Sequence, residues 1–251
     1  MENCYDFYFS KNWWQFVLIA VVGYLVGSFN FAWLISKLKK KDVSKLGSGN
    51  PGAMNMIRNF GPVIGFLVFF LDALKAGGPA LIVYHLYNSG FYASGVVEGA
   101  VFAGKTFPVG CFAAFLCGAC AVLGHVFPIT MRFKGGKGIA CGVGLFWLML
   151  GMANPWFWLI GFLVIVSWLL TITLTKVGSV CTLSYLAIFG VWQVGTLFQA
   201  FGPGNMWISF SVAFIFFVVG LSWVAHRKNI RCLLAGEEHE TVFFKKKGLK
   251  K

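Results

Sequence analysis

Long apolar runs alternate with short polar or basic segments along this chain of 251 residues. A membrane-spanning helix needs about 20 mainly apolar residues, because the hydrocarbon core of a bilayer is about 30 Å thick. Seven runs reach or approach that length, and the fourth is the shortest. They lie at about 13–36, 61–84, 107–128, 138–153, 156–175, 178–200 and 207–225. The pattern predicts an all-α membrane protein, a polytopic bundle of seven transmembrane helices.

The composition agrees with this pattern and predicts a single domain. Hydrophobic residues make up 58% of the chain and charged residues only 12%, about half the share of a soluble domain. We expect one seven-helix transmembrane domain over 1–240 and a basic cytoplasmic tail over 241–251 that contacts anionic lipid. The stretch 85–106 has no clear assignment, and its polar and small residues are compatible with a loop that contains a re-entrant piece.

The basic residues predict the orientation of the bundle. The net charge is +13, which in a soluble protein would suggest a nucleic-acid partner. Here 18 of the 21 Lys and Arg fall in 37–58, 129–137, 176–177 and 226–251, whereas the opposite side holds Lys11 and Lys105 and a span holds Lys75. The positive-inside rule makes the first side cytoplasmic. We therefore expect an external N-terminus, a cytoplasmic C-terminus, an odd number of spans and no nucleic-acid partner.

A glycine-rich basic segment, KLGSGNPGAMNMIR at 45–58, follows the first run on this cytoplasmic side. Gly47, Gly49 and Gly52 permit positive φ, and successive backbone N–H groups in such a turn form a nest that binds anions. No Gly-Lys-Ser/Thr follows at the spacing of a Walker A loop. The alternative is a flexible turn between two spans, although the additional polar side chains favour phosphate binding. These polar candidates are Ser48, Asn50, Asn55 and Arg58.

A second basic segment, KGGKG at 134–138, precedes the fourth run. If a helix starts at Gly138 and Ile139, the free N–H groups of its first turn face the cytoplasm, and the helix dipole favours an anion there. Lys134 and Lys137 add positive charge. The alternative is ordinary anchoring of a span by lysines on its cytoplasmic side.

Further polar groups are predicted on the same face from other loops. His226 and Asn229 lie three residues apart at the end of the last run, Ser179 lies between the fifth and sixth runs, and Glu237 follows. A structural role is the alternative for His226, and also for His125 at the end of the third run. Convergence of side chains from several loops is how a site is built in a helical bundle.

Several kinds of chemistry have no support in the sequence. The chain has eight Asp and Glu, and none lies in a cluster with metal-ligand spacing, so we expect no metal or other cofactor. No Gly-x-Ser-x-Gly elbow and no His-x-x-x-x-Asp motif are present. Asp72 and Lys75 lie three residues apart within the second run, and we interpret them as a structural ion pair, with a role in the site as the alternative.

These residues resemble the bacterial integral-membrane acylphosphate:glycerol-3-phosphate acyltransferases, the PlsY family. The resemblance is carried by GSGNPGAMNMIR at 47–58, by Leu71-Asp72 with Lys75, by GHVFPITMRFKGGKGIA at 124–140 and by HRKNIRCLLAGE at 226–237. It implies acyl transfer from a fatty acyl phosphate to the 1-hydroxyl of glycerol 3-phosphate, which gives lysophosphatidic acid and phosphate in the first acylation of bacterial phospholipid synthesis. It also implies a cell-membrane location with the active site facing the cytoplasm, and a functional link to a soluble enzyme that produces acyl phosphate.

The resemblance assigns roles to the candidate residues. Catalytic roles fall to Ser48, Arg58, Lys137 and His226, and substrate binding to Gly47, Gly49, Asn50, Asn55, Lys134, Gly138, Ser179, Asn229 and Glu237. The chain departs from the family pattern at Met54, where a Thr is usual, and at Asn30 and Ser44, where Pro and Arg are usual.

The residues leave two questions open. The proton of the attacking hydroxyl passes either to a phosphate oxygen of a substrate or to His226 or Glu237 acting as a general base. A polytopic bundle with basic loops is also compatible with an anion transporter or channel, or with a lipid-associated scaffold. Against transport, the polar groups gather at one face and no inverted repeat is detectable.

Overall fold

The computed structural model describes residues 9–88 and 108–237, and these form a helical bundle without strands. Of the stretch 85–106, which the sequence left without clear assignment, residues 85–88 belong to α4 and the rest lies outside the described residues, as do the N-terminal eight residues and the tail 241–251. The elements are α1 Phe9–Ser28, α2 Phe31–Leu38, η1 Val43–Lys45, α3 Ala53–Phe60, α4 Pro62–Asn88, α6 Pro108–Val126, η2 Ile129–Met131, α7 Ile139–Ala153, α8 Trp156–Thr175, α9 Gly178–Phe201, α10 Met206–Ala225 and α11 Arg227–Leu234.

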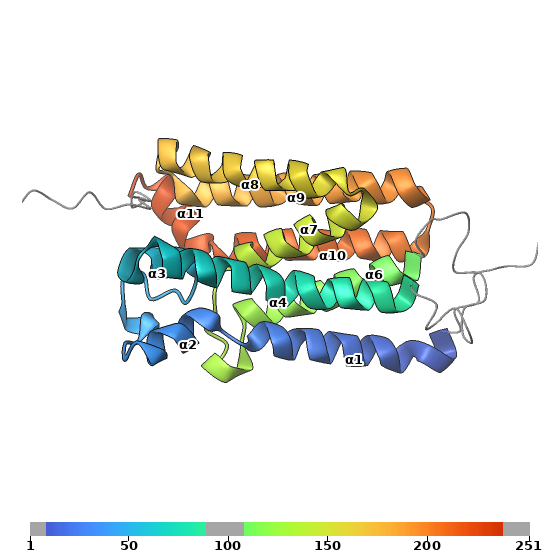
Figure 1. Cartoon of the computed structure of the whole chain (residues 1–251), viewed down its shortest axis with the longest axis horizontal. Coiled ribbons are helices and arrows are strands. Elements are labelled where there is room, and N and C mark those ends of the chain that lie inside the picture. Colours follow the sequence, from blue (N-terminus) through green and yellow to red (C-terminus); the bar gives the residue numbers. More distant parts are fainter. Residues whose placement is uncertain (1–8, 89–107, 238–251) are drawn as a thin grey trace, which may run out of the picture.

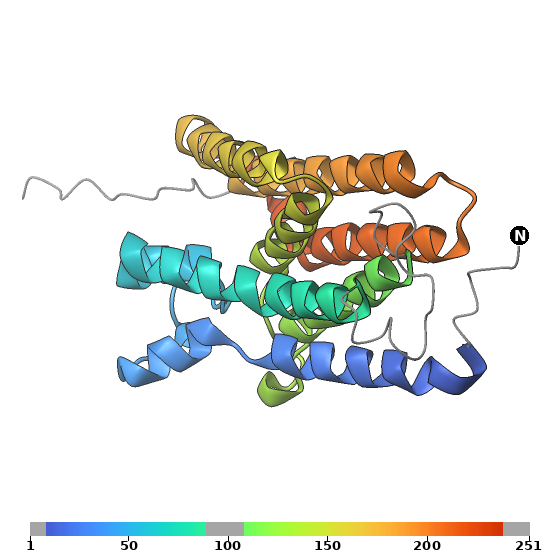
Figure 2. The same cartoon turned by 45° about the vertical axis from the view of Figure 1, so that its right-hand side comes forward.

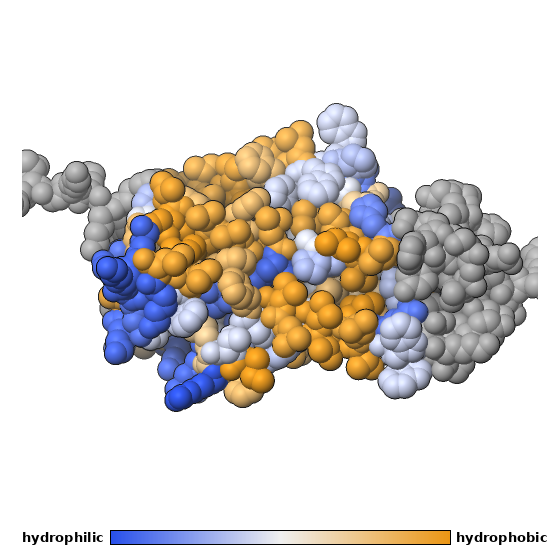
Figure 3. Space-filling model, turned by 60° about the horizontal axis from the view of Figure 1, so that its bottom comes forward, coloured by the Kyte–Doolittle hydropathy of each residue, from blue (hydrophilic) through white to orange (hydrophobic). Residues whose placement is uncertain are grey.

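The long helices run along a common axis, and the short helices α2, α3 and α11 gather at one end of it (Figure 1). The same arrangement is visible after rotation, with α7 crossing the interior of the bundle (Figure 2). A hydrophobic band covers the middle of the surface, and hydrophilic residues concentrate at the end that carries α2 and α3 (Figure 3). We call this end the basic end. The distribution is that expected of a bundle whose middle faces lipid.

Within the described residues, six helices are long and apolar enough to cross a membrane. The fourth predicted run, 138–153, forms α7, whose 15 residues extend only about 22 Å at 1.5 Å per residue. Ten of those residues are buried, because α7 packs against α4, α8 and α9 inside the bundle. A helix surrounded by other helices does not need the full length of a lipid-facing span.

The first run, predicted as one helix over 13–36, is interrupted, so that prediction was wrong in its detail. α1 ends at Ser28 and α2 begins at Phe31. Asn30 ends the continuity because it has extended backbone angles and its side-chain oxygen accepts a hydrogen bond from the Trp33 N–H at 2.8 Å. This is an N-cap, which starts a new helix. The Phe29 carbonyl, left without a helical partner, accepts a hydrogen bond from Lys75 Nζ at 2.7 Å.

Small residues allow the central helices to approach closely. A Cβ added at Gly144 of α7 would overlap with the backbone carbonyl of Ala73 on α4, and one at Gly27 of α1 would overlap with that of Ala121 on α6. Backbone carbonyls cannot move aside as a side-chain tip can. These glycines therefore set the spacing of the helices that carry the polar residues described below.

Replacing Gly144 with alanine should destabilise the folded protein by about 1–3 kcal/mol, because α7 and α4 would have to separate. Gly220 of α10 is a matched control, since nothing lies within 4 Å of a Cβ added there. Gly220→Ala should be neutral or stabilising, by up to about 1 kcal/mol. Thermal unfolding of both variants in detergent measures the difference. Equal unfolding temperatures for the two variants would show that the α4–α7 spacing does not depend on Gly144.

Candidate functional site

The segment 45–58 at the basic end is a tight turn followed by a short helix. Gly47 and Gly49 have φ of +54° and +68°, so the prediction of positive φ is confirmed for these two positions. It is wrong for Gly52, which is extended at φ −140° and forms the N-cap position of α3. The sequence pattern indicated a turn over the whole segment 45–58 and no helix, whereas Ala53–Phe60 forms α3. Apolar contacts explain the helix, because Met56 packs on Val43 and Val68 in a buried cluster.

Asn55 holds the turn together. Its side-chain amide donates to the carbonyls of Val43 and Leu46 at 3.3 and 2.9 Å, and its oxygen accepts from the Ser48 N–H at 3.2 Å. Asn59, one turn later, donates to the same oxygen at 3.0 Å. Asn55 is 1% exposed. Because its amide is occupied by the backbone of the turn, the geometry favours a positioning role for Asn55 over direct contact with a substrate.

The other polar residues of this segment are accessible. Ser48 and Arg58 are exposed, and Asn50 is partly exposed. Within the described residues Arg58 forms no salt bridge. Its guanidinium is therefore free to bind an anion with two parallel hydrogen bonds.

The segment 134–138 leads into α7 as predicted. Gly138 has φ +82°, and α7 begins at Ile139 with a first hydrogen bond from the Gly142 N–H to the Gly138 carbonyl at 2.8 Å. The N–H groups of the first turn therefore have no partner within the helix. Lys137 Nζ donates to Asn229 Oδ1 of α11 at 2.6 Å, so two predicted site residues that are 92 positions apart are in contact. Lys134 is exposed.

His226 lies at the junction of α10 and α11, where the chain changes direction. Its Nδ1 is 2.8 Å from the Ser222 carbonyl oxygen, a contact that requires Nδ1 to carry the proton. The pKa of His226 is lowered to about 4, mainly by burial and also by the nearby Lys137 ammonium, and the hydrogen bond to the Ser222 carbonyl only partly opposes these two effects. His226 is therefore neutral at pH 7, and its Nε2 is available as a hydrogen-bond acceptor.

A buried apolar cluster brings the separate segments to one end of the bundle. Ile57 of α3 packs with Trp168 and Ile172 of α8, and partly buried residues join them from α3, α7 and α9, namely Met54, Ile139 and Cys181. Ile139 is adjacent to Gly138, and Cys181 is two residues beyond Ser179. Met54, the departure from the family pattern, thus serves as a packing residue here.

The remaining predicted site residues are not part of the contact between Lys137 and Asn229. Ser179 is buried in the first turn of α9. Glu237 is exposed beyond α11, its backbone N–H donates to the Cys232 carbonyl at 2.8 Å, and it makes no ion pair within the part of the chain that the structure describes. Among the described residues, no hydrogen bond or ion pair joins Gly49, Asn50 or Lys134 to His226 or Asn229.

Sequence reasoning missed two residues of this site. Asn59 buttresses Asn55, and its position one helical turn away was the available signal. Ser222 is fully buried, its hydroxyl has no hydrogen-bond partner among the described residues, and it lies beside Gly138 at the start of α7. Its spacing of four residues before His226 could have indicated that it shares the His226 face.

Three possible metal ligands also meet in the interior. The ligand atoms of Asp72, His125 and Cys141 lie within 4.8 Å of one another, a cluster that sequence spacing did not show. Lys75 Nζ lies 2.9 Å from Asp72 Oδ1, which confirms the predicted ion pair. The ammonium already supplies the positive charge that Asp72 requires, so these residues do not fit a divalent ion.

Comparisons with known proteins agree on one family. A family model described as glycerol-3-phosphate acyltransferase matches residues 17–236. A glycerol-3-phosphate acyltransferase of Thermotoga petrophila is 36% identical over 235 residues, which cover 93% of this chain and 99% of the relative. Glycerol-3-phosphate acyltransferase 2 of Thermotoga maritima is 34% identical with the same coverage.

Two solved structures have the same fold. They are crystal structures of PlsY, an integral membrane glycerol 3-phosphate acyltransferase, in a glycerol 3-phosphate form and a lysophosphatidic acid form. Their TM-scores are 0.66 and 0.64, and each is 28% identical, with 90% of this chain and 95% of the other covered.

Proposed function

The chain belongs to the glycerol-3-phosphate acyltransferase family, and from this premise we propose that its acyl donor is a fatty acyl phosphate. The acyl group would pass to the 1-hydroxyl of glycerol 3-phosphate, giving lysophosphatidic acid and inorganic phosphate. Support comes from the motif resemblance and from the absence of a His-x-x-x-x-Asp motif, which acyltransferases using acyl-CoA or acyl carrier protein commonly carry. A soluble enzyme that makes acyl phosphate would supply the donor.

One observation carries this proposal: Lys137 contacts Asn229 at 2.6 Å beside the neutral His226 and the start of α7. The lysine charge, the free N–H groups of α7 and the helix dipole all favour a phosphate at this point. Arg58 of α3 and the Gly47–Asn50 turn that precedes α3 offer a second group of donors, and α3 lies at the same end of the bundle as α11 (Figure 1). Because both substrates carry phosphate, two anions must lie close together, and cationic groups offset their repulsion.

The reaction needs no covalent enzyme intermediate. The 1-hydroxyl oxygen attacks the carbonyl carbon of the acyl phosphate, and the bond from that carbon to the phosphate oxygen breaks. The phosphate leaves with the electron pair and takes up the hydroxyl proton on one of its oxygens. The protein contributes by holding the two substrates together and by neutralising charge. His226 orients a substrate through Nε2.

The membrane arrangement follows from the same proposal. The seven apolar helices would each cross the bilayer, with the N-terminus outside, the C-terminus in the cytoplasm and the basic end at the inner leaflet of a bacterial cell membrane. The single domain would span 1–240. The acyl tail would remain among the lipids, between helices.

The test is an assay of the purified protein in detergent. With glycerol 3-phosphate and acyl phosphate we expect lysophosphatidic acid and one equivalent of phosphate, and with acyl-CoA we expect no product. Product from acyl-CoA at a similar rate would refute the proposed donor. Absence of product with every donor would favour an anion transporter.

The pH dependence of kcat identifies the proton acceptor. A base with the pKa of His226 would lose activity only as the pH falls towards about 4. A phosphate oxygen, with a pKa near 6, would lose activity below about pH 6. We expect the second result, and we expect the same acidic limb in His226→Asn, whose amide replaces the Nδ1 donor. Disappearance of the limb in this variant, with a loss of about 10²-fold or more, would make His226 the base.

A further inference from the structure

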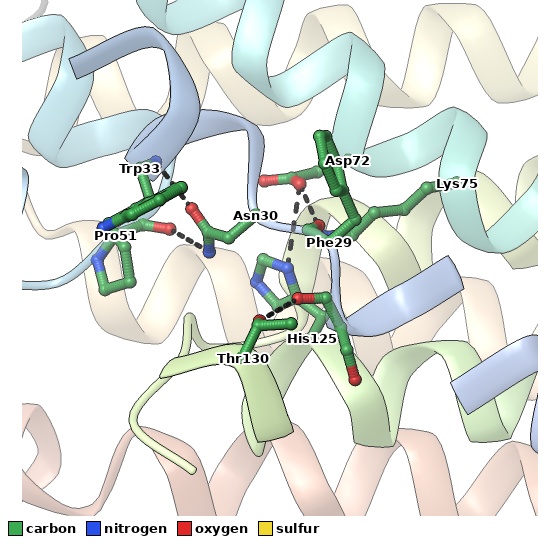
Figure 4. Close-up of polar contacts among 9 residues, drawn as sticks. Phe29, Asn30, Trp33, Pro51, Asp72, Lys75, His125 and Thr130 are labelled. Carbon is green, nitrogen blue, oxygen red and sulfur yellow. Dashed lines mark hydrogen bonds and ion pairs between the residues drawn. The ribbon is translucent and has the colours of Figure 1, made fainter. Parts of the chain in front are cut away.

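A buried polar network runs from the break between α1 and α2 to the interior of the bundle (Figure 4). Lys75 of α4 donates to the Phe29 carbonyl in that break and pairs with Asp72 one turn earlier on the same helix. The Asp72 carboxylate in turn faces His125 Nδ1 of α6 at 3.7 Å. Two helices, α4 and α6, are thus connected to the break between α1 and α2.

On one side this network supports the segment 134–138. The Gly136 N–H donates to the His125 carbonyl at 3.0 Å, and the Gly135 N–H to the Val126 carbonyl at 3.1 Å. A Cβ at Gly136 would overlap with Nε2 of the His125 ring. The backbone of this segment therefore lies directly on the imidazole. The position of the ring in turn fixes the position of the backbone that carries Lys134 and Lys137.

On the other side the network reaches the segment 45–58. The side chain of Asn30, adjacent to Phe29, donates from Nδ2 to the Pro51 carbonyl at 3.1 Å. Its oxygen simultaneously caps α2. A second link lies nearby, because the Thr130 hydroxyl donates to the Ser28 carbonyl at 2.9 Å. The break at Phe29–Asn30 therefore contacts the segment 45–58 directly through Pro51, and Ser28 at its edge contacts Thr130, four residues before the segment 134–138.

The network is dry. Asn30, Asp72, Lys75 and His125 are 5%, 1%, 6% and 3% exposed. A buried ion pair is weak evidence for stability, since apolar side chains of similar volume often stabilise as much or more. A buried polar network instead restricts the structure to one arrangement, because few arrangements satisfy its hydrogen bonds.

We propose that this network is a positioning device that fixes the distance and orientation of the segments 45–58 and 134–138 relative to each other, with Asn30 and His125 as its two ends. This inference rests on the proposed function, in which each segment binds one substrate phosphate. If the two phosphates were displaced relative to each other by about 1 Å, the hydroxyl would no longer be well placed to attack the acyl carbon. The relative position of the two segments therefore affects both binding and turnover.

A double-mutant cycle in the full-length protein tests the coupling. Asn30→Ser retains an N-cap residue but is too short to reach Pro51, and His125→Ala removes the ring beneath Gly136. Each single variant should lower kcat/KM by about 10-fold. If the two residues act through one network, the double variant should lose at least about 5-fold less than the product of the two single effects.

The readout separates positioning from stability. A purely structural role would reduce the amount of active enzyme and hence the apparent kcat, with KM unchanged for both substrates. Positioning should raise KM for both substrates in each single variant, and His125→Asn, whose amide replaces Nδ1, should recover part of the loss. A second cycle, which combines Gln193→Leu with His125→Ala, is the control. Gln193 is buried in α9, about 22 Å along the helix from its first residue, Gly178, and lies outside the network. The effects of these two substitutions on kcat/KM should therefore multiply.

Multiplicative effects of Asn30→Ser and His125→Ala, or unchanged KM values in both, would overturn the proposal. The cycle is run with whichever acyl donor the detergent assay identifies. A wrong donor in the proposed function therefore does not change the result of the cycle, and a failed cycle does not change the donor.

Discussion

Replacing Arg58 with alanine should reduce turnover by about 10²–10³-fold while the protein still inserts and folds. Arg58 is exposed on α3 and forms no salt bridge within the described residues, so the fold does not depend on its charge. Loss of a charged donor aimed at a phosphate removes stabilisation where charge accumulates in the transition state. The measurement is kcat and KM for both substrates, together with the unfolding temperature in detergent.

A lysine at the same position refines this test. Arg58→Lys should recover only part of the activity, because an ammonium cannot form the two parallel hydrogen bonds of a guanidinium. Arg231→Ala is the matched control, since Arg231 is also exposed at the basic end, on α11. We expect activity within a few-fold of the wild type in the control. Wild-type activity in Arg58→Ala would remove this residue from the phosphate site.

Replacing Lys137 with methionine should lower kcat by about 10²-fold or more. Methionine preserves the apolar stem of lysine and removes the charge at the start of α7 together with the contact to Asn229. No other described cation contacts Asn229 Oδ1. In the proposed mechanism the leaving phosphate would lose a positive charge that stabilises it, and the loss should therefore appear in kcat.

The same variant has a second, independent signature. Because the Lys137 ammonium lowers the pKa of His226, Lys137→Met should raise that pKa from its value of about 4 towards the ordinary value for histidine. Nuclear magnetic resonance of labelled histidine detects the change, and the His226→Asn variant assigns the signal. Lys228→Met, an exposed neighbour of Asn229, should change neither kcat nor the titration. An unchanged pKa in Lys137→Met would contradict the contact between these segments.

The helices were predictable because lipid imposes a simple requirement on the chain. Apolar runs of sufficient length cross a bilayer as helices, and the runs at 61–84, 156–175 and 178–200 correspond to α4, α8 and α9. The break at Phe29–Asn30 was not predictable in the same way. The run continues with apolar residues on both sides of Ser28 and Asn30, and the break is stabilised by Lys75, 46 positions from Phe29.

For the candidate site, the sequence predicted backbone conformation better than it predicted which side chains remain available to a substrate. Glycine at 47 and 49 indicated positive φ because glycine adopts it without strain. Asn55 looked like a ligand, yet the folded turn occupies its amide, and Gly52 looked like a turn residue, yet it starts a helix. A side chain's type states which hydrogen bonds it can form, and only its neighbours determine which ones remain available for a substrate.

The sequence by itself determined that this chain is a helical membrane protein of the glycerol-3-phosphate acyltransferase family with two basic, glycine-rich segments. Composition, run length and local motifs depend only on the order of residues along the chain, so they can be recognised without knowledge of the fold. Only the tertiary structure decided that Lys137 meets Asn229, that burial keeps His226 neutral, and that Asn30 and His125 support separate segments. These features depend on packing between residues far apart in the chain, where distance and burial set the energies.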